Sequence, residues 1–123
     1  MEQYFRSIYK PYGQRTDAQW RRNTETSLRR LPDGRVTPHY DPAMVRQFSA
    51  HPTDYDQWAA WDAMTIPVLV LRSADSDLLL PDVAEAMRNR GPRAMVVTIP
   101  GCGHAPALNV PAQFGVVERF FSG

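Results

Sequence analysis

The chain has 123 residues, with 43% hydrophobic and 22% charged residues, which suits one modest globular domain with a buried core. Its formal net charge of +1 favours neither nucleic acid nor an anionic membrane as a partner. No apolar run approaches the ~18 residues of a membrane-spanning helix, and no signal-peptide core is present at the N-terminus. One cysteine excludes an internal disulfide, so we expect a cytoplasmic protein without metal or cofactor.

The first third of the chain shows helical patterns. Apolar side chains at helical spacing predict a helix over 2–9, and the proline and glycine that follow end it. Thr16 opens a second predicted helix over 16–31, because a glutamine three residues later completes a capping box. The Pro-Asp-Gly sequence at 32–34 predicts a turn, which leads into a short extended segment over 35–40.

Two further helix starts follow. Asp41 stands before a proline, which is the order of an N-cap residue and a first helical residue. Asp54 and Gln57 have the spacing of a second capping box, at the start of a helix that includes Trp58 and Trp61. These two indoles share one face of that helix, which indicates packing on the core or, alternatively, the wall of a substrate pocket.

The pattern changes after residue 66. Continuous apolar runs predict strands over 67–72 and 94–100 that are buried on both faces. Helices are predicted over 81–91 and 110–121, so the order is strand, helix, strand, helix. This βαβα order predicts an α/β fold in which the two strands are parallel and the crossover is right-handed.

Apolar stripes on both helices indicate which faces are buried. The inward residues of the first helix are expected to be Val83, Ala86 and Met87. The buried stripe of the last helix is expected to consist of Val110, Phe114, Val117 and Phe121. Two strands are too few for a parallel sheet, so we expect the open strand edge to pair with a second copy in a homo-oligomer.

Polar residues follow each predicted strand, where the functional groups of open parallel sheets gather. Asp75 and Asp77 follow the first strand, and His104 lies between glycine turns after the second, 27 residues beyond Asp77. An acid and a histidine so placed suit two members of a Ser-acid-His triad, in which the acid orients the imidazole and the imidazole deprotonates the nucleophile. Spacing to Pro81 favours Asp77, and Asp75 is the alternative acid.

The segments PVLVLRSADSDLLLPDVAEAM and MVVTIPGCGHAPALNVPAQFGVVERFF resemble the C-terminal end of α/β-hydrolases. The resemblance implies Asp77 as the acid and His104 as the base of the triad. It also implies that residues 1–62 are cap or lid helices and that residues 63–123 are the C-terminal βαβα part of the core. Ser73 is a departure, because many members of the family have glycine there.

A larger departure concerns the nucleophile. The family places its serine in a G-x-S-x-G elbow upstream of the acid and the histidine, and this sequence contains no such pentapeptide. We therefore expect the C-terminal portion of a serine-type hydrolase that is inactive alone and acts on a small molecule once an N-terminal part completes it. Two alternatives stay open: a thiol nucleophile at Cys102, and a non-enzymatic oligomerising or ligand-binding module.

Overall fold

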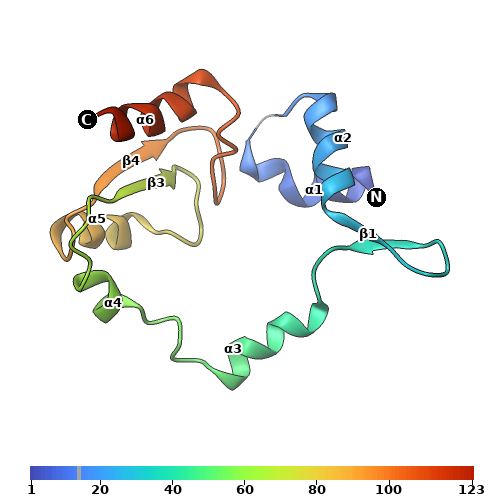
Figure 1. The fold of residues 1–123 in the computed structure, drawn as a ribbon, viewed down its shortest axis with the longest axis horizontal. Coiled ribbons are helices and arrows are strands. Elements are labelled where there is room, and N and C mark those ends of the chain that lie inside the picture. The colour runs from blue at the N-terminus through green and yellow to red at the C-terminus, as the bar shows by residue number, and fades with distance from the viewer. Residues whose placement is uncertain (14) are drawn as a thin grey trace.

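A computed structural model describes residues 1–13 and 15–123 (Figure 1). Its α-helices are α1 (Glu2–Tyr9), α2 (Asp17–Thr26), α3 (Arg46–Ala50), α4 (Trp58–Asp62), α5 (Pro81–Asn89) and α6 (Pro111–Ser122). Its strands are β1 (Leu28–Arg30), β2 (Val36–Pro38), β3 (Leu69–Ser73) and β4 (Met95–Ile99). Two short 3₁₀ helices, η1 (Lys10–Tyr12) and η2 (Pro42–Val45), extend α1 and precede α3.

The start of α2 confirms the predicted capping box, but its end does not match the prediction. The Thr16 hydroxyl accepts a hydrogen bond from the backbone of Gln19, and the Gln19 side chain accepts one from the backbone of Thr16. The helix stops at Thr26, and β1 pairs with β2 as an antiparallel hairpin. The predicted turn at 32–34 explains the difference, because it brings the two extended segments into register and the ladder outweighs helix propensity.

The predicted N-cap at Asp41 is confirmed, whereas the capping box at Asp54 is wrong. The Asp41 carboxylate accepts a hydrogen bond from the backbone of Ala43 at 2.8 Å. At α4 the Gln57 side chain instead donates to the Asp54 carbonyl, and the Asp56 carboxylate accepts from the backbone of Trp58 at 3.3 Å. Helix α4 begins three residues later than predicted. Asp56 is then the aspartate close enough to accept a hydrogen bond from its first turn.

The segment over 39–57, which includes η2 and α3, is exposed along its whole length. In Figure 1 this segment runs along the bottom of the view, from the β1–β2 hairpin to α4. Its apolar side chains Met44, Val45 and Phe48 are exposed, and Phe48 stacks on Tyr55 at 5.1 Å between ring centroids. Helices η2 and α3 therefore present an apolar surface that nothing else in the described chain covers.

Strands β3 and β4 form the predicted parallel pair, in register from Leu69 opposite Met95 to Ser73 opposite Ile99. The predicted burial on both faces is wrong for β4, where Met95 and Thr98 are exposed, because a two-stranded sheet has too few neighbours to cover both of its faces. Helix α5 connects them, as Figure 1 shows. The buried centre of the core consists of Ala84, Ala94 and Val96. It is completed by the partly buried side chains of Trp61, Val68, Val70 and Leu79.

The predicted inward face of α5 is confirmed only in part, and the buried stripe of α6 is wrong. Val83, Ala86 and Met87 are half-buried, but Ala84 is the buried residue of α5. On α6 the side chain of Phe121 is 80% exposed, and Val110 and Phe114 are exposed as well. A two-stranded sheet offers too little surface to cover a 12-residue helix, so the apolar spacing is present without a matching core.

Within residues 1–13 and 15–123, no helix is long and apolar enough to cross a membrane.

Candidate active site

The loops that leave β3 and β4 are joined by backbone hydrogen bonds. The backbone N–H of Ala74 donates to the carbonyl of Ile99 at 2.8 Å, and that of Asp75 donates to the carbonyl of Cys102 at 3.2 Å. Because the strands are parallel, both loops start at the same end of the sheet. The aspartate-bearing loop and the histidine-bearing loop are therefore neighbours, as the sequence predicts.

A buried polar contact lies beneath the two loops. The Cys102 thiol, 2% exposed, donates to the hydroxyl of Ser73, 0% exposed, at 3.2 Å. The same sulfur lies 3.6 Å from the carbonyl of Ile99. Ser73 thus has a structural role that the sequence analysis did not foresee, since its hydroxyl links the end of β3 to the loop after β4.

Buried side chains hold the aspartate loop from inside. The Ser76 hydroxyl accepts hydrogen bonds from the backbones of Leu78 and Leu79, at 3.3 and 3.0 Å. The buried Arg72 guanidinium donates to the carbonyls of Leu79 and Ala74. The sequence patterns did not identify Arg72 as a supporting residue. Its position at the end of an apolar run was the one signal that could have done so. These contacts define the loop on which Asp75 and Asp77 are both exposed.

His104 is exposed on a loop that the N-terminal segment supports. The backbone of Gly103 donates to the carbonyl of Pro11, and a Cβ at Gly103 would lie 2.6 Å from that oxygen. Only glycine allows this close approach. The imidazole of His104 stands edge-on to the ring of Tyr12, with centroids 6.0 Å apart and planes at 90°. Residues 11–12 thus form one wall beside the predicted base.

The structure brings the two loops together but does not join the predicted acid to the predicted base. In the described part of the chain, the histidine that pairs with a carboxylate is His51, with Asp54, and no hydrogen bond or ion pair links His104 to Asp75 or Asp77. The expected direct contact between Asp77 and His104 is thus not formed here. Both aspartates are exposed, and the assignment of Asp77 rather than Asp75 as the acid stays a prediction.

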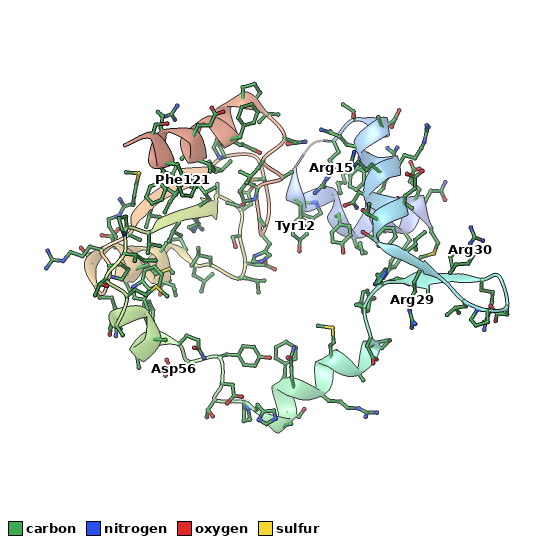
Figure 2. All side chains as sticks on the ribbon, viewed as in Figure 1. Tyr12, Arg15, Arg29, Arg30, Asp56 and Phe121 are labelled. Atoms are coloured by element: carbon green, nitrogen blue, oxygen red, sulfur yellow. The ribbon has the colours of Figure 1, made fainter. Side chains whose placement is uncertain are left out.

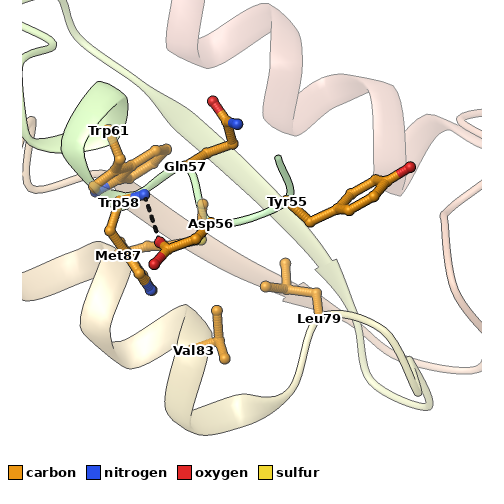
Figure 3. A pocket seen from close by; sticks show the side chains of 8 residues that line it. All are labelled: Tyr55, Asp56, Gln57, Trp58, Trp61, Leu79, Val83 and Met87. Carbon is orange, nitrogen blue, oxygen red and sulfur yellow. Dashed lines mark hydrogen bonds between the residues drawn. The ribbon is translucent and has the colours of Figure 1, made fainter. Parts of the chain in front are cut away.

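An apolar pocket of about 570 Å³ lies beside this site, between the residues around α4 and helix α5 (Figure 3). Its apolar walls include Trp58, Trp61, Leu79 and Met87. Neither Asp77 nor His104 lines it. Trp61 also packs on the core and donates from its indole nitrogen to the carbonyl of Arg90 at 3.1 Å. The predicted core packing of Trp61 is therefore confirmed, and its role as the wall of a substrate pocket stays a prediction.

Residues 2–115 match the alpha/beta hydrolase family. The chain belongs to the alpha/beta hydrolase family. The match covers most of the chain and includes the parallel strands and both loops that carry the predicted triad residues. The expected membership is thereby confirmed, and the structure is a fragment of the α/β-hydrolase fold with helices, a hairpin and a parallel strand pair.

Among curated proteins, this chain is similar to a 3-hydroxybutyrate-oligomer hydrolase from Cupriavidus necator, with 33% identity over 98% of the chain and 44% of the relative. A pimeloyl-[acyl-carrier protein] methyl ester esterase from Nitrosomonas europaea is 36% identical over 48% of the chain and 23% of the relative. An α/β hydrolase structure from Novosphingobium aromaticivorans superposes with a TM-score of 0.77 and 28% identity, over 98% of the chain and 44% of that structure. The chain spans less than half the length of these relatives.

Proposed function

We propose that this chain supplies the acid and the base of a serine-type α/β-hydrolase, with Asp77 as the acid and His104 as the base. The observation that carries the proposal is the hydrogen-bonded pair of loops at the carboxyl ends of β3 and β4. In this reading residues 63–123 are the C-terminal part of the hydrolase core, and residues 1–62 are cap helices that reach the site through Pro11 and Tyr12.

The serine that His104 would activate lies outside these 123 residues, because they contain no G-x-S-x-G sequence. One imidazole nitrogen of His104 takes the proton of the attacking hydroxyl and later returns it to the leaving group. The carboxylate of Asp77 accepts a hydrogen bond from the other nitrogen, which selects the tautomer and stabilises the imidazolium. A change at the exposed side chain of Asp77 must bring its carboxylate to the imidazole, and we expect this contact to form in the completed enzyme.

The names of the two curated relatives support carboxylic esters as the substrates. One relative is a methyl ester esterase, and the other hydrolyses oligomers of a hydroxy acid, whose units are joined by ester bonds. We propose the same bond type for the completed form of this protein. Its product would then be a small carboxylic acid.

A chimera tests the proposal. The segment of the Cupriavidus necator hydrolase that aligns with this chain is replaced by residues 1–123, and hydrolysis of p-nitrophenyl butyrate is measured. We expect His104→Ala to abolish turnover and Asp77→Asn to lower kcat by about 10³–10⁴. Asp75→Asn is the matched control and should stay within about twofold of the parent chimera.

Circular dichroism of each variant separates loss of chemistry from loss of fold. Loss of turnover in Asp75→Asn with full activity in Asp77→Asn would transfer the acid role to Asp75. Full activity in His104→Ala would remove the basis of the proposal.

A further inference from the structure

A second pocket, about 310 Å³ in volume, lies between α2 and the segment that follows His104. Four of its lining residues are Arg15, which precedes α2, and Gln19, Arg22 and Asn23 on that helix. Spacings of three and four residues place the last three on one face of the helix. Ala107 and Asn109, shortly after His104 in the chain, form the opposite wall. The pocket thus shares a loop with the predicted base.

The charge of this pocket is positive and uncompensated. Among the described residues, no aspartate or glutamate lines this pocket. In the described chain, neither Arg15 nor Arg22 takes part in an ion pair. Two guanidinium groups that share a concave surface without a carboxylate favour an anionic ligand.

Arg15 is held in place before any ligand arrives. Its guanidinium lies 4.9 Å from the centroid of the Trp20 ring and donates to the carbonyl of Tyr9 at 3.3 Å. Figure 2 shows Arg15 and Tyr12 between the N-terminal helices and the loop after β4. Because stacking and the hydrogen bond fix the plane of the guanidinium, little side-chain entropy is lost when its free N–H groups bind.

An unpaired donor supports the same interpretation. The side-chain amide nitrogen of Asn23 is buried and has no hydrogen-bond partner among the described residues. Buried N–H groups are nearly always paired, so this one indicates an acceptor other than the described residues 1–13 and 15–123. A carboxylate oxygen supplies such an acceptor and also pairs with the two arginines.

We propose that this pocket binds the free carboxylate of a small organic acid, and that it holds the acid part of the substrate or product during ester hydrolysis. The link to hydrolysis rests on the proposed function, whereas the binding of a carboxylate rests on Arg15, Arg22 and Asn23. A phosphate group fits less well, because no glycine lines the pocket and phosphate sites commonly use a cradle of backbone N–H groups.

Binding is tested on the 123-residue chain without turnover. The probes are 3-hydroxybutyrate, its neutral methyl ester and inorganic phosphate, each titrated to about 20 mM while the fluorescence of Trp20 is followed. Trp20→Phe identifies the signal of this indole against those of Trp58 and Trp61. We expect a saturable change with 3-hydroxybutyrate and affinity weaker by about tenfold or more for the methyl ester and for phosphate.

The variants Arg15→Gln and Arg22→Gln should each weaken binding of 3-hydroxybutyrate by about tenfold. The matched control is Arg29→Gln, an exposed arginine on the β1–β2 hairpin, which should leave affinity unchanged. Arg22 is exposed, so its replacement tests the site even if Arg15→Gln unfolds the chain.

Equal affinity for acid and methyl ester, tighter binding of phosphate, no saturation, or an equal loss in Arg29→Gln would each overturn the pocket assignment. Absence of binding together with an active chimera would overturn this inference and leave the proposed function intact. Binding by the chain together with an inactive chimera would contradict the proposed function and leave the assignment of the carboxylate pocket intact.

Discussion

The thiol of Cys102 lies 3.2 Å from the hydroxyl of Ser73, and both side chains are buried. This contact joins the end of β3 to the loop after β4, beside the backbone bond from Asp75 to the carbonyl of Cys102. The burial of the sulfur also bears on the alternative that Cys102 is the nucleophile. A nucleophile must reach a substrate, and this sulfur is enclosed by the loops that it connects.

We expect Cys102 to resist a thiol reagent in the native chain. With 5,5′-dithiobis(2-nitrobenzoate), release of the coloured thiolate should be slow without denaturant and complete within the mixing time in concentrated urea. Cys102→Ala is the control for reagent background. Rapid stoichiometric labelling of the folded chain would show that the loop over 101–104 opens readily, and would revive the thiol as a candidate nucleophile.

The 123-residue chain should not hydrolyse p-nitrophenyl esters faster than its His104→Ala variant. It has no serine elbow, and loss of one oxyanion donor alone lowers rates by about 10²–10³. Spectrophotometric release of p-nitrophenol is the measurement. Turnover that disappears in both His104→Ala and Asp77→Asn would reveal a nucleophile within the chain, and Cys102→Ala would then identify it.

Gly91→Ala should destabilise the chain by roughly 1–3 kcal/mol. Gly91 has φ of +59°, and a Cβ there would lie 2.6 Å from the carbonyl oxygen of Trp61. Urea unfolding followed by tryptophan fluorescence measures the change. Gly115→Ala on α6 is the matched control, because its Cβ meets only the Arg119 side chain at 3.5 Å, and it should stabilise by about 0.5–1 kcal/mol. A loss of stability as large in Gly115→Ala would show that the effect is not local to α4.

The ion pair between Asp62 and Arg90 should make stability depend on pH below about 4. The hydrogen bond from Arg90 holds the pKa of Asp62 below its ordinary value of 3.8. Because the pKa of Asp62 is lower in the folded chain than in the unfolded chain, its ionised carboxylate stabilises the fold fully at pH values above the unfolded pKa. This stabilisation is lost as the pH falls through the folded pKa. The urea midpoint should therefore drop less between pH 7 and pH 3 in Asp62→Asn than in the parent. Equal drops in the two proteins, with Glu118→Gln as control, would contradict this.

We propose that the isolated chain associates through its open strand edges. Each strand of the β3–β4 pair has one neighbour in the described chain, which leaves backbone groups on the outer edges unpaired. Light scattering at micromolar concentrations should give a mass above 14.0 kDa. The exposed apolar face of α3 is the competing surface, so Phe48→Ser should leave the mass unchanged. A monomer at all concentrations, or dissociation by Phe48→Ser, would contradict association through the strand edges.

Local chemistry made several elements predictable. The caps at Thr16 and Asp41 form as expected, because each depends on a side chain and a backbone group only two or three residues away. The parallel pair β3–β4 was predictable as well, since the order strand, helix, strand favours a parallel pair, although the predicted burial of β4 on both faces is wrong. Both loops at the strand ends follow from that pairing.

Other features depend on contacts between distant parts of the chain. The end of α2 was mispredicted because the hairpin ladder of β1 and β2 competes with helix propensity only after the turn has formed. The apolar residues of α6 are exposed because their burial depends on how large a sheet the helix can pack against. The spacing of apolar residues within the helix carries no information about the size of that sheet. The sequence by itself therefore determined the parallel strands β3 and β4, the caps at Thr16 and Asp41, and the placing of aspartate and histidine on adjoining loops. Tertiary structure alone decided the buried contact of Ser73 with Cys102, the ring of Tyr12 beside His104 and the cationic pocket around Arg15, because each depends on residues brought together from distant positions in the chain.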